Sequence, residues 1–302
     1  MKTRDWFLFW LLGIIWGTSF LWIKIAVQEI SPLVLVGFRA LFGALGILVI
    51  LLVSKNQDFS WSVIKPNLFN FFILGLVNIA LPFLLISWAE QFIDSGIASI
   101  LNGTMPLFTI WISPIFISDD RITPPKIVGL ITGFIGVVIL MSPSIRGGWS
   151  SSLLGQAAVL LAVFFYASAT VFARRQGGKL APILQAFLQL AWGAAIVWSI
   201  ALTVENPLIL PSKPLTWVAL LWLGLLGSCL AYIIYFNLLH QIGPTRMSMV
   251  TYIPPLVGVV LGVLFLGEQF SWTALIGALL ILSGITIVNQ EKISFPRRKV
   301  SE

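Results

Sequence analysis

Polar side chains recur at helical spacing inside a stretch of sequence that is otherwise apolar. Between positions 95 and 113 they stand at steps of three or four residues, which places them on one face of a helix. The members of this face are Ser95, Ser99, Asn102, Pro106, Thr109 and Ser113. Hydroxyl and amide groups bind a polar solute or a neighbouring helix by hydrogen bonds. The sequence therefore predicts a hydrogen-bonding face that lines a site in the bundle interior or joins two helices.

Amide and aromatic side chains form similar faces elsewhere in the chain. One face comprises Gln185, Gln189 and Trp192, and another comprises Ser228, Tyr232 and Tyr235. Asn78 lies one turn before Pro82, and the aromatic residues Trp16 and Tyr166 stand apart from these faces. A pocket with aromatic walls and a few amide or hydroxyl groups suits an apolar or aromatic zwitterion better than a solute with several charges. Aromatic residues also serve in packing or as anchors at the membrane interface, so packing remains the alternative for Trp16.

Arg39 is the one cation placed well inside an apolar stretch. An unpaired charge there is costly, so the guanidinium should meet a carboxylate, backbone carbonyls or a substrate, or reach the nearer interface. Binding of a substrate carboxylate is one hypothesis, and a structural network of hydrogen bonds is the other.

Catalytic and metal-binding constellations are not predicted. The chain has one cysteine, Cys229, and one histidine, His240, which excludes a disulfide framework and a zinc site built from several such residues. No Asp or Glu falls at the centre of an apolar stretch, so paired carboxylates for acid–base catalysis are missing. We expect no enzymatic activity, no metal and no cofactor. Glu90 and Asp94 fall near an interface, so a proton relay has little support.

The composition of the whole chain is unusually apolar and poor in charged residues. Of 302 residues, 58% are hydrophobic and 10% are charged, whereas about a quarter of residues in soluble proteins are charged. Ten apolar stretches of roughly 18–24 residues are each long enough to cross a hydrocarbon layer of about 30 Å. Such stretches are too long for barrel strands, and lipid leaves helices as the remaining choice. The sequence predicts an all-α integral membrane protein with ten transmembrane helices.

The net charge of +7 is interpreted as a topology signal. If the amino terminus is cytoplasmic, fourteen Lys and Arg residues fall on the cytoplasmic side and three on the outer side. This bias predicts that both termini are cytoplasmic. The expected location is the cell (inner) membrane, and the expected contacts of the basic residues are lipid headgroups, not nucleic acid.

The two halves of the chain resemble each other. At an offset of 148 positions, Pro106, Asp120, Gly129 and Gly136 correspond to Pro254, Glu268, Gly277 and Gly284. At an offset of 150 positions, Trp16, Pro32 and Arg39 correspond to Tyr166, Pro182 and Gln189. Because five helices are an odd number, the second copy enters the membrane from the opposite side. The sequence predicts two inverted five-helix repeats, residues 1–146 and residues 147–302, around a site near the middle of the bilayer.

Prolines inside the apolar stretches predict hinges, because proline removes a backbone hydrogen bond from a helix. The predicted hinge residues are Pro82, Pro106, Pro254 and Pro255. Pro106 would free the carbonyl of Asn102, which could then contact a substrate beside the Asn102 amide. Asp120 and Glu268, at corresponding turns on opposite faces, are predicted to cap helices or to act as gates.

Short motifs in both halves carry a family resemblance. Trp16-Gly17-Thr18-Ser19-Phe20, Ser31-Pro32 followed by Arg39, and the repeated proline-to-acid pattern ending in Leu266-Gly267-Glu268 resemble the EamA family of the drug/metabolite transporter superfamily. The resemblance covers essentially the whole chain. In the second copy it departs from the pattern at Arg246, where a small residue is expected, and at Gly243-Pro244 in place of Ser95-Gly96. It implies a ten-helix transporter of small metabolites, with helices one, three, four, six, eight and nine around a central cavity.

The expected function is a secondary transporter that exports small metabolites, chiefly amino acids including aromatic and neutral ones, by alternating access between the repeats. A carrier of cationic drugs or nucleosides and a passive, channel-like facilitator are the alternatives. The predicted substrate-binding residues are Trp16, Arg39, Asn78, Ser99, Asn102, Tyr166, Gln185, Gln189, Tyr232 and Tyr235. The expected partners are a small-molecule substrate and the lipid bilayer, with the protein as a monomer or a weak homodimer.

Overall fold

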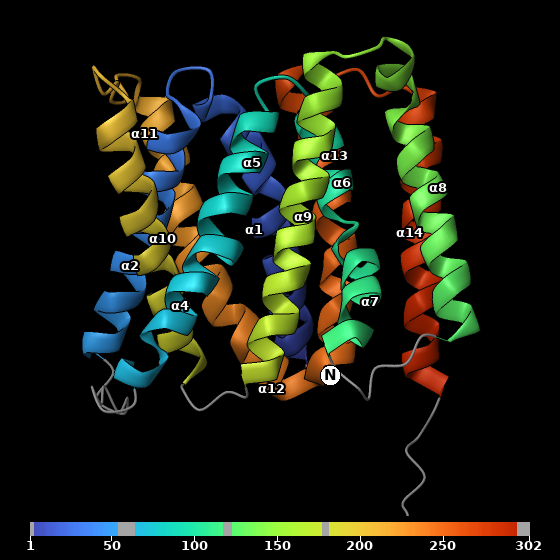
Figure 1. The fold of residues 1–302 in the computed structure, drawn as a ribbon, viewed down its shortest axis with the longest axis horizontal. Coiled ribbons are helices and arrows are strands. Elements are labelled where there is room, and N and C mark those ends of the chain that lie inside the picture. The colour runs from blue at the N-terminus through green and yellow to red at the C-terminus, as the bar shows by residue number, and fades with distance from the viewer. Residues whose placement is uncertain (1–2, 54–63, 117–122, 177–180, 295–302) are drawn as a thin grey trace, which may run out of the picture.

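The computed structural model describes residues 3–53, 64–116, 123–176 and 181–294, and the elements in these ranges are all helical (Figure 1). In chain order they are α1 (Thr3–Ala26), α2 (Pro32–Val53), η1 (Lys65–Asn67), α4 (Leu68–Leu74), η2 (Gly75–Ala80), α5 (Leu81–Ala89), α6 (Ser95–Asn102), α7 (Met105–Phe116), α8 (Pro124–Arg146), α9 (Ser151–Gln176), α10 (Pro182–Val204), α11 (Pro214–Leu221), η3 (Trp222–Leu230), α12 (Ala231–Met247), η4 (Ser248–Tyr252), α13 (Ile253–Leu266) and α14 (Trp272–Ser294).

The length and composition of these helices confirm the predicted class. Within the described ranges, nine helical segments are apolar and long enough to cross a membrane, and Trp272–Val288 within α14 is a shorter apolar helix. Large apolar side chains on the outside of the bundle are exposed, among them Leu52, Phe69 and Phe265. An open groove of about 400 Å³ on α8 has an entirely apolar lining and belongs to the same surface. The protein is an all-helical membrane protein.

The two ends of the described chain lie at one face of the bundle. α1 begins and α14 ends at this face, which we call the near face; the opposite face is the far face (Figure 1). Successive crossings alternate in direction, so the far face carries the connections 27–31, 90–94, 147–150, 205–213 and 267–271.

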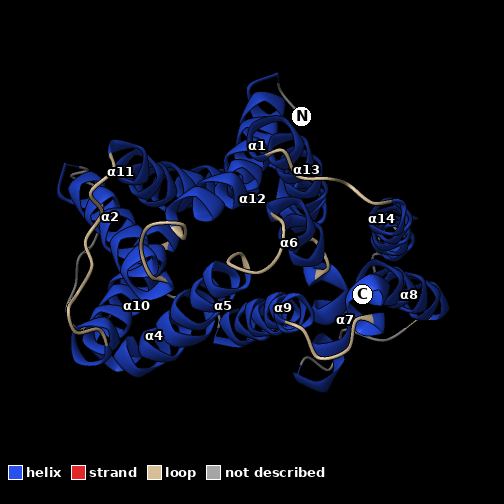
Figure 2. Ribbon diagram, turned by 90° about the horizontal axis from the view of Figure 1, so that it is seen from above, coloured by secondary structure: helices blue, strands red, loops and turns tan. Residues whose placement is uncertain are grey.

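Helices of the two halves pack in corresponding pairs, with α2 against α10 and α8 against α14 (Figure 2). The repeated glycines lie at the contact of α8 with α14. A Cβ at Gly129 would lie 2.6 Å from the carbonyl oxygen of Gly284, and a Cβ at Gly284 would lie 2.5 Å from that of Gly129. Gly136 and Gly277 approach each other in the same reciprocal way. These glycines allow the two backbones to touch.

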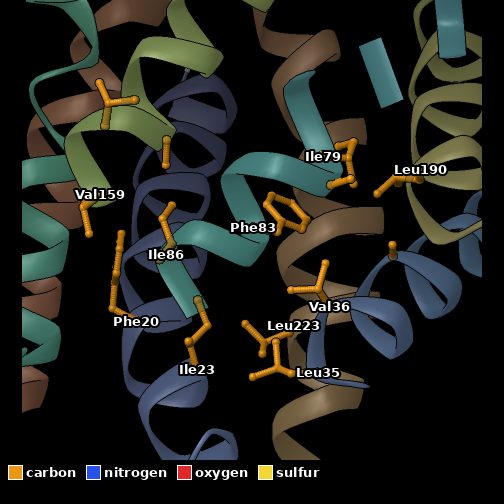
Figure 3. Packing of buried hydrophobic residues seen from close by; sticks show 14 of the residues in the cluster. Phe20, Ile23, Leu35, Val36, Ile79, Phe83, Ile86, Val159, Leu190 and Leu223 are labelled. Atoms are coloured by element: carbon orange, nitrogen blue, oxygen red, sulfur yellow. The ribbon is translucent and has the colours of Figure 1, made fainter. Parts of the chain in front are cut away.

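The core between the halves is filled by aliphatic and aromatic side chains. Its main cluster draws on α1, α2, η2, α5, α9, α10 and η3, and Figure 3 shows Phe20, Ile23, Leu35, Val36, Ile79, Phe83, Ile86, Val159, Leu190 and Leu223. In lipid, close packing and not the exclusion of water drives helix association. The tight contacts of this cluster therefore fix α2, α5, α9 and α10 relative to one another.

The structure corrects the prediction of a continuous fourth helix. That stretch divides into α6 and α7 at Gly103 and Thr104, so its polar face is interrupted after Asn102. The third and eighth stretches contain the π-helical segments η2 and η3, and the ninth begins with the 3₁₀ segment η4. The predicted hinge prolines all stand in the first turn of a segment: Pro82 in α5, Pro106 in α7, and Pro254 and Pro255 in α13. A first turn needs few backbone donors, so proline is accommodated there.

Candidate functional site

Arg39 lies inside the bundle, about seven residues and thus roughly 10 Å along α2 from its first residue. Its side chain is 7% exposed. Nε donates a hydrogen bond to Oγ of Ser228 in η3 at 3.4 Å, and the guanidinium carbon lies 3.8 Å from the ring centroid of Phe83 in α5. The hydrogen bond and the cation–π contact hold the charge in the interior, so Arg39 does not reach the interface.

Tyrosine residues from the second half lie near this guanidinium. Tyr166 of α9 and Tyr232 of α12 are close enough to interact electrostatically with Arg39. The ring of Tyr166 also contacts that of Phe83, with 6.5 Å between the centroids. Arg39 is thus surrounded by aromatic side chains from three helices.

The aromatic lining continues from Tyr232 toward α1. Tyr235 lies one turn along α12 and interacts with Tyr232, and its ring contacts that of Trp16 at 5.8 Å. Trp16 is half-buried and packs in a cluster separate from that of Tyr166. Trp16 and Tyr166, which stand 150 positions apart in the sequence, therefore pack in different clusters.

Two amide side chains join the same region. Nδ2 of Asn78 in η2 donates a hydrogen bond to Oε1 of Gln189 in α10 at 2.8 Å, and Tyr232 forms a hydrogen bond with Asn78. Gln189 stands 150 positions after Arg39, so the first half of the chain contributes a cation here and the second half a neutral amide. We call this group the central cluster; it comprises Arg39, Asn78, Phe83, Tyr166, Gln189, Ser228 and Tyr232.

The central cluster has unused hydrogen-bonding capacity at Arg39. A guanidinium carries five N–H donors, and among the described residues the structure records one hydrogen bond from it, that of Nε to Ser228. The N–H groups of its two terminal nitrogens are available to a ligand. A carboxylate can accept two parallel hydrogen bonds from a guanidinium, and the surrounding aromatic rings favour a ligand whose carboxylate is attached to an apolar group.

A second group of predicted residues lies where α6 crosses α13. Oγ of Ser99 donates to the carbonyl oxygen of Gly96 at 2.7 Å, with the carbonyl oxygen of Pro255 at 3.5 Å. Asn102 ends α6, and its buried Oδ1 has no hydrogen-bond partner among the described residues. A buried amide oxygen without a donor is uncommon in folded proteins, which makes Asn102 a candidate for binding a donor group of a ligand.

The structure therefore divides the predicted site into groups. Arg39, Asn78, Tyr166, Gln189 and Tyr232 meet in the central cluster, Trp16 and Tyr235 adjoin it, and Ser99 and Asn102 stand at the crossing of α6 with α13. Gln185 is half-buried one turn from Gln189 on α10. Arg39 lies in α2 and Gln189 in α10, so two helices outside the set that the family resemblance implies also contribute side chains to the central cluster.

Glu268 caps a helix of the other half at the far face. Its Oε1 accepts a hydrogen bond from the backbone N–H of Ser95 at 2.7 Å, and its Oε2 accepts one from the N–H of Gly96 at 3.0 Å. A carboxylate at the start of α6 is favoured by the free N–H groups and by the helix dipole. Glu268 thus connects the segment after α13 to α6. Its counterpart Asp120 lies outside the described residues.

Glu29 makes a similar connection, which the sequence did not predict. Its Oε1 accepts hydrogen bonds from the N–H of Ser212 at 2.7 Å, the Oγ of Ser212 at 2.6 Å and the N–H of Lys213 at 2.9 Å, while Oε2 accepts one from Thr216 Oγ1. The hydroxyl groups of Ser212 and Thr216 lower the pKa of this carboxyl to about 2. Glu29 therefore binds the start of α11 as a carboxylate.

Replacement of Glu29 with glutamine should lower the melting temperature more near pH 6 than near pH 3. The lowered pKa means that the carboxylate stabilises the fold above the ordinary glutamate value of about 4.3, and that this contribution is lost as pH falls toward 2. Thermal unfolding in detergent would measure the difference between wild type and variant at both pH values. Glu205→Gln, in another far-face connection, serves as the control. A Glu29→Gln difference that does not change with pH would contradict the expectation.

Comparisons with known proteins place the chain among membrane transporters. The model of the EamA-like transporter family matches residues 6–142 and again residues 153–290. The chain is 30% identical over 291 residues to the uncharacterized transporter YoaV of Bacillus subtilis, covering 95% of this chain and 96% of that protein. It is 28% identical to the uncharacterized inner membrane transporter YedA of Escherichia coli, covering 96% and 92%. It is 27% identical to a probable amino-acid metabolite efflux pump of Salmonella typhimurium, covering 95% of each.

Proposed function

This chain belongs to the EamA-like transporter family, and from that premise we propose that it is a secondary transporter that exports small metabolites, with neutral and aromatic amino acids as its main substrates. The observation that carries the substrate class is the Arg39 guanidinium, which is buried among aromatic rings and keeps donors for a ligand. An amino acid supplies the matching groups, a carboxylate for Arg39 and an apolar or aromatic side chain for the rings.

The proposed mechanism is alternating access between two inverted repeats, residues 1–146 and residues 147–302. The reciprocal glycine contacts of α8 with α14 and the two matches of one family model support a duplicated architecture. Glu268 and Glu29 connect the two halves at the far face. On this proposal, these connections hold the far face closed in the present conformation and must open before a substrate can leave there.

We infer that the near face is cytoplasmic and that the protein resides in the inner membrane. The excess of Lys and Arg on that side of the sequence supports this orientation, and the relative YedA is named as an inner membrane protein. The protein is proposed to act as a monomer or a weak homodimer. Tags at both ends that react from the cytoplasmic side only would agree with the orientation; a tag reached from outside would refute it.

Counterflow in proteoliposomes tests the function directly. The purified protein is reconstituted, the vesicles are loaded with one unlabelled solute, and uptake of the labelled solute is followed for amino acids, nucleosides and cationic drugs. Saturable counterflow with neutral and aromatic amino acids is the expected result. Counterflow with cationic drugs or nucleosides alone would replace the proposed substrate class, and flux that does not saturate would indicate a channel.

Replacement of Asn102 with alanine should raise the apparent transport constant for the substrate several-fold and leave the amount of protein in the membrane unchanged. The reason is the buried Oδ1, which has no partner in the described structure and is available to a donor of the substrate. Uptake at graded substrate concentrations gives the constant. Asn102→Asp, which keeps the acceptor, should retain more of the wild-type affinity, and unchanged kinetics of Asn102→Ala would remove this residue from the site.

A further inference from the structure

Glu90 is an acidic residue at the end of α5 whose side chain is enclosed by protein. It directly follows the last residue of that helix, at the far face, and its exposure is 0%. Neither carboxylate oxygen has a hydrogen-bond partner among the described residues. Burial of an ionised carboxylate without donors costs several kcal/mol, and such a group binds a proton instead.

The nearest cation is engaged with the backbone. Nζ of Lys24 in α1 donates hydrogen bonds to the carbonyl oxygen of Glu90 at 2.6 Å and to that of Ile93 at 2.7 Å. These are carbonyls at the carboxyl end of α5, where a cation is favoured. Lys24 therefore closes the end of the helix and makes no hydrogen bond to the Glu90 carboxylate.

The surrounding charges do not offset this burial. Burial holds the pKa of the Glu90 carboxyl well above its ordinary value; Lys24 and Arg39 oppose that shift, and Glu268 adds to it. Asp94, in the connection that follows, also interacts with Glu268 and Lys24. Both carboxylate oxygens of Glu268 accept hydrogen bonds from the start of α6. The Glu90 carboxyl group is therefore expected to be protonated and neutral in this conformation.

We propose that the Glu90 carboxyl is a proton-binding site that couples substrate export to the proton gradient. This inference rests on the proposed function. When the far face is open, water reaches the carboxylate, which takes one proton from the outer solution and forms an O–H bond. The neutral group can then be buried as the far face closes around it. After the near face opens, water that enters from the cytoplasmic side solvates the carboxyl group and removes the effect of burial. The O–H bond then breaks, the proton passes to that water and the carboxylate remains, so that one proton enters for each substrate exported.

A proton fits this site better than a metal cation. Sodium would require several oxygen ligands at once, and the two carbonyl oxygens at the end of α5 already accept from the Lys24 ammonium. No group of three or more Asp, Glu, His or Cys residues among the described positions could hold a metal ion. The position of Glu90 also suits coupling, because its charge interacts with both Glu268 at the far face and Arg39 in the central cluster.

The first experiment measures coupling in proteoliposomes with the substrate found by counterflow. In the wild type, a pH gradient should drive substrate accumulation, and addition of substrate should change the lumenal pH reported by a trapped dye. Glu90→Gln should lose both effects, and its counterflow should no longer vary with pH, because glutamine mimics the neutral carboxyl. Asp94→Asn, a change of the same kind four positions away, should retain both. Gradient-driven accumulation by Glu90→Gln, or accumulation by the wild type with a sodium gradient only, would overturn the proposal.

The second experiment does not depend on transport. The infrared spectrum of the wild type minus that of Glu90→Gln at neutral pH should contain the C=O stretch of a neutral carboxyl group, and this band should disappear only at alkaline pH. Carboxylate bands in its place would overturn the proposal. A wild type without counterflow for any solute would refute the proposed function, while the infrared difference would still decide the state of Glu90.

Discussion

Replacing Arg39 with glutamine is expected to lower kcat/KM for a neutral amino acid by at least roughly 30-fold, because removing one partner of a buried, hydrogen-bonded charge pair costs about 2–5 kcal/mol. The substrate carboxylate would lose its cation inside the bundle. Arg39→Lys should restore only part of the activity, since an ammonium cannot form the two parallel hydrogen bonds of a guanidinium. Initial rates of uptake at graded concentrations measure both variants.

The thermal stability of the same variants separates binding from structure. In the described structure Arg39 has one hydrogen bond and one ring contact, so loss of its charge should leave the melting temperature in detergent unchanged or raise it. A decarboxylated amine should compete equally with substrate in wild type and Arg39→Gln. The control is Arg146→Gln, the same change at an exposed residue of α8. A large fall in melting temperature for Arg39→Gln, with unchanged kcat/KM in the folded fraction, would show that Arg39 is structural.

Substitution of Gly284 with valine is expected to abolish correctly folded protein, and alanine at the same position should cost about 1–3 kcal/mol of stability. A Cβ at Gly284 would lie 2.5 Å from the carbonyl oxygen of Gly129 and 2.6 Å from the backbone nitrogen of Gly133. Backbone atoms cannot rotate away as the end of a side chain can, so α8 and α14 would have to separate. The monodisperse fraction on size-exclusion chromatography and the melting temperature measure the effect.

A glycine at the end of α8 offers the matched control. A Cβ at Gly147 would meet backbone oxygens at 3.5 and 3.6 Å, which are ordinary contacts, and Gly147→Ala should behave as wild type. If Gly284→Ala and Gly147→Ala were equally stable, the backbone contact of α8 with α14 would not contribute as described.

Periodicity in the sequence predicted which residues share a helix face, and several of these faces meet in the structure. Helical spacing predicts Gln189 and Tyr232 on inward faces, and the cost of a charge in lipid predicts the same for Arg39; the structure links the three through Asn78 and Tyr232. Phe83 could not be selected, since nothing in an apolar run marks one phenylalanine as the ring beneath a guanidinium. That contact depends on the rotation of α5 against α2, which tertiary packing decides.

Glu90 shows a second limit of sequence reasoning. Its position at the end of an apolar stretch suggested an interface location, where a carboxylate is solvated. In the structure Glu90 is buried, with α9 packed against the end of α5 at Gly155, Lys24 of α1 bonded to the Glu90 carbonyl oxygen, and Glu268 near enough to interact with the carboxyl group. The break after Asn102 is a similar case: the helical pattern of the sequence continues across Gly103 and Thr104, whereas the structure ends α6 at Asn102 and begins α7 at Met105.

Arg39 in the first half and Gln189 in the second stand at matching positions of the proposed repeats, and their difference in charge has a consequence for the direction of flux. If the halves exchange conformations during transport, a fully symmetric protein would present the same environment, with the same energy, to either compartment. A single cation on one half removes that equivalence, so a carboxylate should bind with different affinities from the two sides. Half-saturation measured separately at each membrane surface should therefore differ, and the carrier would act as a partial rectifier even without a driving ion.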